Sequence, residues 1–192
     1  AAVVAVAHLG FRLQGADAAT ARQSAFSVAN EVEGHPDNAA PSAFGGLNLS
    51  AGGQIHTVVP ELDDGQFFVW LPGHVSLTNE SRARLATEVS LSDVIVQAAS
   101  CAAVFGGLLT GSWELMRGAN FDRVHERQRL EQMPDAAAVV TQLRDAGHVA
   151  WLSGSGPAIA ALIERDGEQF VPAAPGEWAR LRVDLEGCVE LD

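Results

Sequence analysis

Eight residues near the start of the chain, EVEGHPDN at positions 31–38, combine three carboxylates with a histidine and an amide. These side chains could form a metal site, an acid–base pair or a clamp for a polar substrate, or they could belong to a polar turn without a function. A single histidine disfavours zinc, whereas carboxylates suit Mg²⁺, which takes one or two protein oxygens and completes its shell with phosphate and water. The segment alone does not decide between a magnesium site, an acid–base pair, a clamp for a polar substrate and a polar turn without a function.

A second candidate is the stretch LSGSGP at positions 152–157, between two apolar runs. Its glycines allow the backbone to approach a ligand closely and to present N–H groups to it. Ser153 stands where the nucleophile motif G-x-S-x-G has its first glycine, so this is not a nucleophile elbow. The stretch is either a turn that contacts a ligand or a plain hairpin turn.

Arginines supply the third candidate set. Arg82 follows Thr78 by four residues, which places both on one face of a helix, and Arg123, Arg127 and Arg129 cluster further along. Two arginines from different helices that meet at a pocket would bind a carboxylate or a phosphate in bidentate geometry. The alternative for each arginine is a solvated helix face with ion pairs.

The totals exclude several classes of function. The 192 residues carry a net charge of −12, which argues against nucleic acid as a partner, because binding to phosphate backbones needs an electropositive surface. All twelve cationic residues are arginines, and the absence of lysine excludes a lysine Schiff base, a lysine-bearing P-loop and a lysine general base in this chain. A phosphorylated small molecule stays open, because a few arginines can reverse the field within one cleft.

The remaining features point to a protein of a reducing compartment. Cys101 and Cys188 are far apart and lack metal-ligand spacing, so we expect two buried thiols and a cytoplasmic location. No apolar run approaches the roughly 20 residues that span a bilayer, so no membrane is expected as a partner. The first residues, AAVVAVAHLG, have neither an initiator methionine nor a basic segment, and they indicate a helix already under way inside a domain.

The elements that would position these residues mix helices and strands. Hydrophobic periodicity predicts helices over 1–14 and 17–33, a short helical turn from Pro41, strand-like pieces over 47–60, and an acidic turn at 61–65 as a domain boundary. After that turn we expect a strand over 66–72, a short helix near 78–86 and a core helix over 91–109. A broken helix pair follows and ends at Pro134, and an amphipathic helix is expected over 135–147. The chain should finish with a strand–turn–strand around LSGSGP and a last strand from 177. This order predicts an α+β or α/β fold in two lobes.

Together the motifs resemble the homoserine kinase family of the GHMP kinase superfamily. EGHPDNAAPSAFGGL resembles the signature E-G-H-x-D-N-x-A-P-x-x-x-G-G, and LSGSGPAIAAL resembles the third, glycine-rich motif of the superfamily. TNESRARL and HERQRLEQMP follow in the family's order and spacing, so the resemblance covers essentially the whole chain. It implies an α+β fold with part of an N-terminal lobe of the ribosomal-protein-S5-domain-2-like type in residues 1–63 and a ferredoxin-like C-terminal lobe in residues 64–192.

The resemblance also implies roles for individual residues. Glu31 matches the glutamate that approaches the Mg²⁺ of Mg-ATP, and the residues matching the homoserine site are His35, Asp37, Asn38, Thr78, Arg82 and Arg129. Arg82 and Arg129 would bind the α-carboxylate, and Asp37 would accept from the α-ammonium or the attacking hydroxyl. Asp37 and Arg129 are thus the candidate catalytic residues, while Ser153, Gly154, Ser155 and Gly156 would pack against the phosphate loop and the substrate.

The implied reaction is transfer of the γ-phosphoryl group of ATP to L-homoserine in threonine biosynthesis, with Mg²⁺, and the resemblance allows a homodimer. The family's phosphate loop, P-x-x-x-G-L-G-S-S-A, is expected before residue 1, so we expect these 192 residues alone not to phosphorylate a substrate. The family's N-x-S-R-A pattern is absent from the 91–109 helix, where Gln97 and Ser100 stand instead. The rival hypotheses are another GHMP kinase, acting on a sugar, mevalonate or an isoprenoid precursor, and a non-enzymatic ligand-binding or oligomerisation module.

Overall fold

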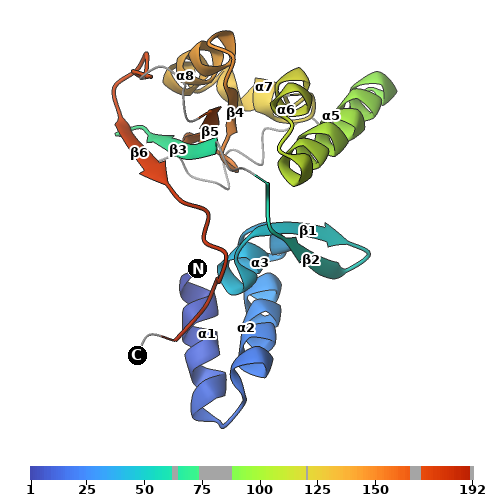
Figure 1. The fold of residues 1–192 in the computed structure, drawn as a ribbon, viewed down its shortest axis with the longest axis vertical. Coiled ribbons are helices and arrows are strands. Elements are labelled where there is room, and N and C mark those ends of the chain that lie inside the picture. Colours follow the sequence, from blue (N-terminus) through green and yellow to red (C-terminus); the bar gives the residue numbers. More distant parts are fainter. Residues whose placement is uncertain (62–64, 74–87, 120, 165–169, 191–192) are drawn as a thin grey trace. The chain divides into compact units, whose positions relative to one another are not determined.

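The computed structural model describes residues 1–61, 65–73, 88–119, 121–164 and 170–190. The chain divides into two compact units (Figure 1): unit 1 comprises Ala1–Pro60 and Val183–Asp192, and unit 2 comprises Glu61–Arg182. The first division lies beside the acidic turn where the sequence predicts a boundary. The C-terminal segment belongs to unit 1, although the sequence predicts that it stays with the second lobe. The assignment of 1–63 and 64–192 to two family domains stays a prediction.

Unit 1 begins with two antiparallel helices, α1 (Ala2–Leu13) and α2 (Ala18–Glu33), which Figure 1 shows as a hairpin. The side chain of Asp17 caps α2 by accepting from the backbone N–H of Thr20 at 2.9 Å. The helix ends at Gly34, whose φ of 76° is the left-handed conformation typical of a C-cap. Both helices are confirmed as the sequence predicts them. Small residues line their core, which comprises Val4, Ala25, Ala29, Ala39 and Ala43.

Helix α3 (Pro36–Phe44) starts five residues earlier than expected. The sequence suggests a turn at 34–38 with a helix from Pro41, but Pro36 is the first helical residue. Proline is well suited to that position, because its fixed φ fits a helix and its missing N–H would have no partner there. Asp37 then stands in the first turn, where a carboxylate is favoured by the helix dipole. The signature residues after His35 therefore lie on a helix.

Strands β1 (Leu47–Ala51) and β2 (Gln54–Val58) form an antiparallel hairpin, with Ala51 opposite Gln54. The C-terminal segment of unit 1 returns to this region: the N–H of Gly46 donates to the carbonyl of Asp184 at 2.7 Å, and the N–H of Cys188 donates to that of Ala43 at 3.1 Å. Glu190 forms an ion pair with Arg12, and one of its carboxylate oxygens lies 3.4 Å from Nε2 of His8. Cys188 is half-buried against the helices, so the expectation of a packed thiol is met only in part.

Gly187 is the residue at which this return leaves no space. A Cβ atom there would lie 2.5 Å from the carbonyl oxygen of Ala43 and 2.5 Å from the nitrogen of Gly45, and its φ is +70°. Gly187→Ala should destabilise unit 1 by at least about 2 kcal/mol, because the left-handed strain adds to a clash between backbones. The measurement is hydrogen exchange at the N–H groups of Gly46 and Cys188, which should lose protection.

The matched control is Gly15→Ala, because Gly15 has a φ of +90° but no atom within 4 Å of the position that a Cβ would take. It should show the conformational cost alone, about 1 kcal/mol. All four tryptophans, Trp70, Trp113, Trp151 and Trp178, lie in unit 2, so tryptophan fluorescence should report unchanged unfolding of that unit. Equal loss of protection in both variants would contradict the clash.

Unit 2 contains a four-stranded antiparallel sheet in the order β4-β5-β3-β6. Its strands are β3 (Gly65–Leu71), β4 (Val149–Leu152), β5 (Ile159–Glu164) and β6 (Glu177–Leu181). Numbered along the chain, this order is 2-3-1-4, the order of a ferredoxin-like sheet. The described residues between β5 and β6, 170–176, form no helix. The last strand is shorter than predicted, since the chain leaves it after Leu181.

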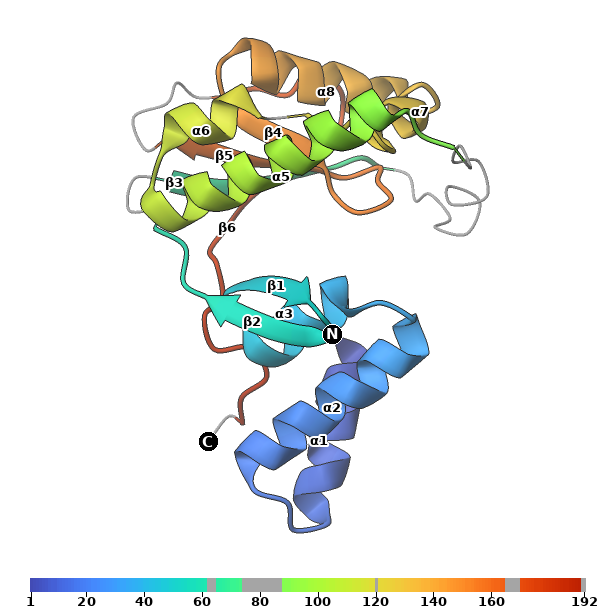
Figure 2. The same cartoon turned by 90° about the vertical axis from the view of Figure 1, so that its right-hand side faces the viewer.

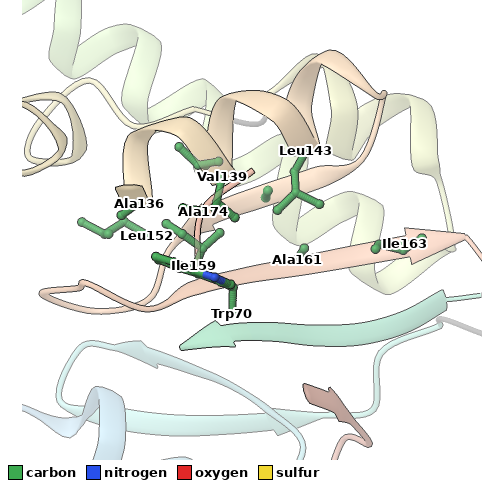
Figure 3. Close-up of a cluster of buried hydrophobic side chains, with 11 residues drawn as sticks. Trp70, Ala136, Val139, Leu143, Leu152, Ile159, Ala161, Ile163 and Ala174 are labelled. Carbon is green, nitrogen blue, oxygen red and sulfur yellow. The ribbon is translucent and has the colours of Figure 1, made fainter. Parts of the chain in front are cut away.

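Both faces of this sheet are covered. Ala150, Leu152, Ile159 and Trp70 form one cluster with helix α8 (Pro134–Asp145), and Figure 3 shows that helix lying over these side chains. On the other face, Val149 and Leu162 pack with Met116 of α6 (Trp113–Gly118) and with residues near it. Because successive side chains of a strand point to opposite faces, the neighbours Val149 and Ala150 belong to different clusters. The end of β4 is therefore held from both sides.

Helix α5 (Leu91–Thr110) forms as predicted, but it is not the core helix that its composition suggests. Among its residues only Ser100 and Gly107 are buried, and Leu91 is 75% exposed. Its C-terminal half packs on α6, as Figure 2 shows, with Gly107 against Met116. Cys101 is exposed, contrary to expectation. By length and composition α5 could cross a membrane, which corrects the expectation that no run is long enough, but a single such helix is weak evidence.

Candidate functional site

The signature residues of unit 1 surround the junction of α2 and α3. Glu31 is exposed in the last turn of α2, and Gly34 ends that helix. His35 is half-buried at the N-cap of α3, and its Nδ1 atom contacts a carboxylate oxygen of Asp37. The same oxygen of Asp37 accepts from the N–H of Asn38 at 2.9 Å. Asp37 is thus oriented by two neighbours while 70% of its side chain stays exposed. At this junction the carboxylate of Asp37 is therefore oriented by the protein and is still exposed to a ligand.

The end of α2 is chemically suited to a cation. Helix carbonyls give this end a partial negative charge, and Glu31 and Glu33 add two carboxylates with no basic residue in the last turn. Among the described residues, no group of three or more histidine, cysteine or acidic side chains could hold a metal ion by itself. One or two carboxylates nevertheless fit Mg²⁺ that is bound to phosphate. The donor set therefore fits a nucleotide-bound Mg²⁺ and does not fit a cage made by protein side chains alone.

In unit 2 the candidate Arg129 lies on helix α7 (Glu126–Leu130). Asp122 lies just before this short helix: one carboxylate oxygen accepts from the N–H groups of Val124 and His125 at 2.7 and 2.6 Å, and from that of Glu126 at 3.2 Å. The other oxygen lies 3.0 Å from Nε2 of His125. Arg129, one turn later, places Nη1 3.1 Å from Nδ1 of His125. Since a guanidinium can only donate, this geometry assigns the imidazole proton to Nε2 and makes Nδ1 the acceptor.

The glycine-rich stretch is the turn between β4 and β5, as predicted. The N–H of Ser153 donates to the carbonyl of Ala158 at 2.8 Å, and the N–H of Gly156 donates to that of Ser153 at 2.9 Å. Gly154 has a φ of 56°, a conformation that favours glycine at this position of a turn. Its carbonyl accepts from Nη1 of Arg129 at 3.0 Å. The turn and Arg129 therefore form one constellation within unit 2.

Glu126 and Arg144 anchor this constellation. Nη2 of Arg144 lies 3.0 and 2.9 Å from the two carboxylate oxygens of Glu126, whose side chain is 4% exposed. One of these oxygens also accepts from the N–H of Leu152 at 2.9 Å. Arg144 donates through Nε and Nη2 to the carbonyl of Ala150 at 3.0 and 2.8 Å. The pair thus ties α7 and α8 to the end of β4, immediately before the turn.

The arginine cluster of the sequence is divided by the structure. Arg123 and Arg127 line a cavity of about 720 Å³ together with Asp122, Glu126 and Arg144, whereas Arg129 faces the glycine turn. Charged groups of this cavity already have protein partners: Asp122 accepts from the backbone N–H of Val124, Glu126 pairs with Arg144, and Arg127 lies 3.5 Å from Glu131. We therefore assign no ligand to the cavity.

The predicted site residues fall into three groups. His35, Asp37 and Asn38 lie together, with Glu31 on the preceding helix, and Arg129 lies with Ser153–Gly156. Thr78 and Arg82 lie outside the described residues. Gln97, where the family pattern departs, accepts through Oε1 from the N–H of Arg123 at 2.8 Å, and Ser100 donates to the carbonyl of Val96 in its own helix. These two positions therefore support local structure.

Sequence reasoning missed Asp122, Glu126 and Arg144 as parts of the constellation. Asp122 could have been found as a turn signal, since aspartate side chains commonly bond to the backbone N–H two residues later. Glu126 and Arg144 could not, because a glutamate and an arginine 18 residues apart resemble any two surface charges until the fold buries them together. The buried state of Glu126 is what singles out this pair.

The chain is similar in sequence to known proteins over most of its length. Residues 108–179, which contain Arg129 and the glycine turn, match the family described as GHMP kinases C terminal. The chain is 36% identical over 170 residues to the homoserine kinase of Streptomyces coelicolor, which covers 85% of this chain and 55% of that protein. It is 34% identical over 171 residues to the homoserine kinase of Thermus thermophilus, covering 88% and 58%. The chain thus spans a little over half the length of these relatives.

The fold agrees as well. The crystal structure of homoserine kinase from Cytophaga hutchinsonii superposes with a TM-score of 0.76 at 21% identity, covering 90% of this chain and 60% of that one. Identity at this level supports the fold alone, and it confirms the predicted mixed α+β class. With the family match in unit 2 and the identities over most of the chain, the conclusion follows that this chain belongs to the GHMP kinase family, in which the curated relatives that it matches are homoserine kinases.

Proposed function

We propose that the protein carrying this chain transfers the γ-phosphoryl group of ATP to the side-chain hydroxyl of L-homoserine. The observation that carries the proposal is the guanidinium of Arg129, which is held at the carbonyl of Gly154 beside the glycine-rich turn. A planar guanidinium has five donors, so it can bind a carboxylate while it donates to the turn. A carboxylate beside the reacting alcohol distinguishes an amino acid from a sugar.

The residues of unit 1 would recognise the rest of the amino acid. Asp37, oriented by His35 and by the N–H of Asn38, would accept from the α-ammonium or from the reacting hydroxyl. An ammonium group is absent from mevalonate and from isoprenoid alcohols, so Asp37 favours homoserine over these acceptors. Thr78 and Arg82 would complete the binding of the substrate, as the family resemblance implies.

The nucleotide would be bound as its magnesium complex. ATP supplies the phosphoryl group, and Mg²⁺ neutralises the charge that develops on the phosphates. Glu31, at the negative end of α2, is the residue of this chain that would hold the ion. Ser153 to Gly156 would pack their compact backbone against the phosphate loop and the substrate, and the N–H groups of Ser153 and Gly156 are used inside the turn.

Little covalent help is needed for this reaction. A bond forms between the side-chain oxygen of homoserine and the γ-phosphorus, the bond from that phosphorus to ADP breaks, and the hydroxyl proton leaves to Asp37 or to water. Positioning and charge stabilisation supply most of the rate acceleration in phosphoryl transfer. Residues that orient Arg129 and Asp37 therefore bear directly on the rate.

A panel of acceptors tests the proposal. The full gene product that contains these residues is incubated with Mg-ATP and with L-homoserine, mevalonate or galactose in turn, and ADP release is followed in a coupled assay. We expect acceptor-dependent ADP release with homoserine alone. Release that depends on mevalonate or on the sugar would support another GHMP kinase, and no acceptor-dependent release would support a non-enzymatic module.

A further inference from the structure

Glu126 is a buried charged residue for which the proposed reaction has no direct use. Its carboxylate has three close donor contacts: two with Nη2 of Arg144 and one with the N–H of Leu152. It is 3% exposed. Burying a carboxylate is costly, and a buried ion pair is seldom more stabilising than apolar residues of the same shape. Stability alone is thus a weak reason for this pair.

The position of Glu126 suggests another reason. It lies three residues before Arg129 on α7, and Leu152 lies two residues before Gly154 in the chain. Helix α7 is therefore joined at two points to the chain around the glycine turn: through Glu126 to the N–H of Leu152, the last residue of β4, and through Arg129 to the carbonyl of Gly154 within the turn. The first link is buried and charge-assisted, while the second is exposed.

Helix α7 is oriented by these links and by Leu130, which packs against the core cluster of α8 and the sheet. With five residues it is too short to be stable by its own hydrogen bonds. Asp122 accepts from the N–H groups of Val124 and His125 before the helix and of Glu126 at its start, but these contacts do not join the helix to the sheet. Among the described contacts, the carboxylate of Glu126 joins the helix to both α8 and β4. A change at Glu126 should therefore move Arg129 relative to Gly154.

We propose that Glu126 is a positioning residue for Arg129: paired with Arg144 and bonded to the N–H of Leu152, it sets the register between α7 and the glycine turn. The inference rests on the proposed function, because Arg129 is taken to bind the carboxylate of the acceptor. Glu126 itself touches no substrate. Its effect on the reaction is expressed through KM for the amino acid and not through binding of ATP.

The first test variant is Glu126→Gln, which keeps the size of the side chain and an acceptor for Leu152 but removes the charge that attracts Arg144. We expect KM for L-homoserine to rise about tenfold, a change of about 1.4 kcal/mol in binding free energy, with KM for ATP unchanged. The second variant, Glu126→Gln with Arg144→Met, removes the unpaired arginine and should recover most of the stability in urea unfolding. Its KM for homoserine should stay raised.

The double variant separates positioning from folding. Wild-type stability together with a wild-type KM for homoserine would overturn the proposal, because the pair would then serve the fold alone. A raised KM at recovered stability supports it. A proton–nitrogen NMR spectrum of the full gene product supplies a readout that does not need turnover: the guanidinium signal of Arg129 should shift in Glu126→Gln.

An unchanged Arg129 signal would overturn the positioning role whatever the activity. If instead the unaltered protein phosphorylates no homoserine while the Arg129 signal shifts in the variant, the proposed function fails and the positioning of Arg129 by Glu126 stands. The two failures are thereby distinguished by separate measurements on the same protein.

Discussion

Replacing Arg129 with alanine is expected to lower kcat/KM for L-homoserine by roughly 100- to 1000-fold, equivalent to about 3–4 kcal/mol of transition-state binding. The loss follows because the guanidinium at Gly154 would no longer meet the α-carboxylate, and a buried or half-buried charge pair that loses one partner is costly. The measurement is the initial rate of ADP release at varied homoserine. The amino alcohol that lacks the carboxylate of homoserine serves as a second acceptor.

The matched control is Arg127→Ala. Arg127 lies on the same helix, but its side chain is 88% exposed and pairs with Glu131 at 3.5 Å, away from the turn. It should change kcat/KM by less than about twofold. The Arg129 variant should phosphorylate the amino alcohol as fast as the unaltered protein does. The amino alcohol has no carboxylate, so Arg129 binds no carboxylate in either protein. If Arg129→Ala slowed both acceptors equally, Arg129 would not be binding the carboxylate.

Arg144→Ala is expected to lower the free energy of unfolding of unit 2 by about 3–5 kcal/mol, because it leaves the carboxylate of Glu126 buried without its cation. The carbonyl of Ala150 also loses the donors Nε and Nη2. Urea unfolding followed by tryptophan fluorescence reports this unit, which contains every tryptophan of the chain.

A double-mutant cycle isolates the pair. In a Glu126→Ala background the carboxylate is already absent, so Arg144→Ala should cost less than about 1.5 kcal/mol. Arg127 is an exposed arginine on the neighbouring helix. The free energy of unfolding of Arg127→Ala should therefore stay within about 0.5 kcal/mol of that of the unaltered protein. A cost for Arg144→Ala below about 1 kcal/mol in the unaltered background would show that Glu126 is solvated and not held as described.

The local elements could be predicted from the sequence where capping and periodicity agree. Helix α2 has Asp17 before it, alanines at helical spacing within it and Gly34 after it, so both of its ends are correct. The turn at Ser153–Gly156 follows from glycines between apolar runs, and the hydrogen bonds within it are those of a tight hairpin. The predicted start of helix α3 is too late, because Pro36 and Pro41 are both plausible first residues and the sequence does not choose between them.

Features that depend on distant residues could not be predicted. The apolar composition of α5 indicates a core helix, but burial depends on which elements reach it, and the described structure leaves Leu91 and Ile95 exposed. The return of residues 183–190 to unit 1 depends on two backbone hydrogen bonds and a close approach at Gly187. In the candidate site, motif resemblance singled out Arg129 and Asp37 as candidates, whereas the contacts that orient Arg129 appear only in three dimensions.

The central claim, that residues of this chain serve phosphorylation of an amino acid, is tested most directly by identifying the product. Phosphorus NMR of the full gene product with Mg-ATP and L-homoserine should show a new phosphomonoester coupled to the side-chain methylene protons, and Arg129→Ala should reduce its rate of formation at least about 100-fold. The absence of that signal, with a phosphomonoester formed instead from mevalonate or galactose, would contradict the account.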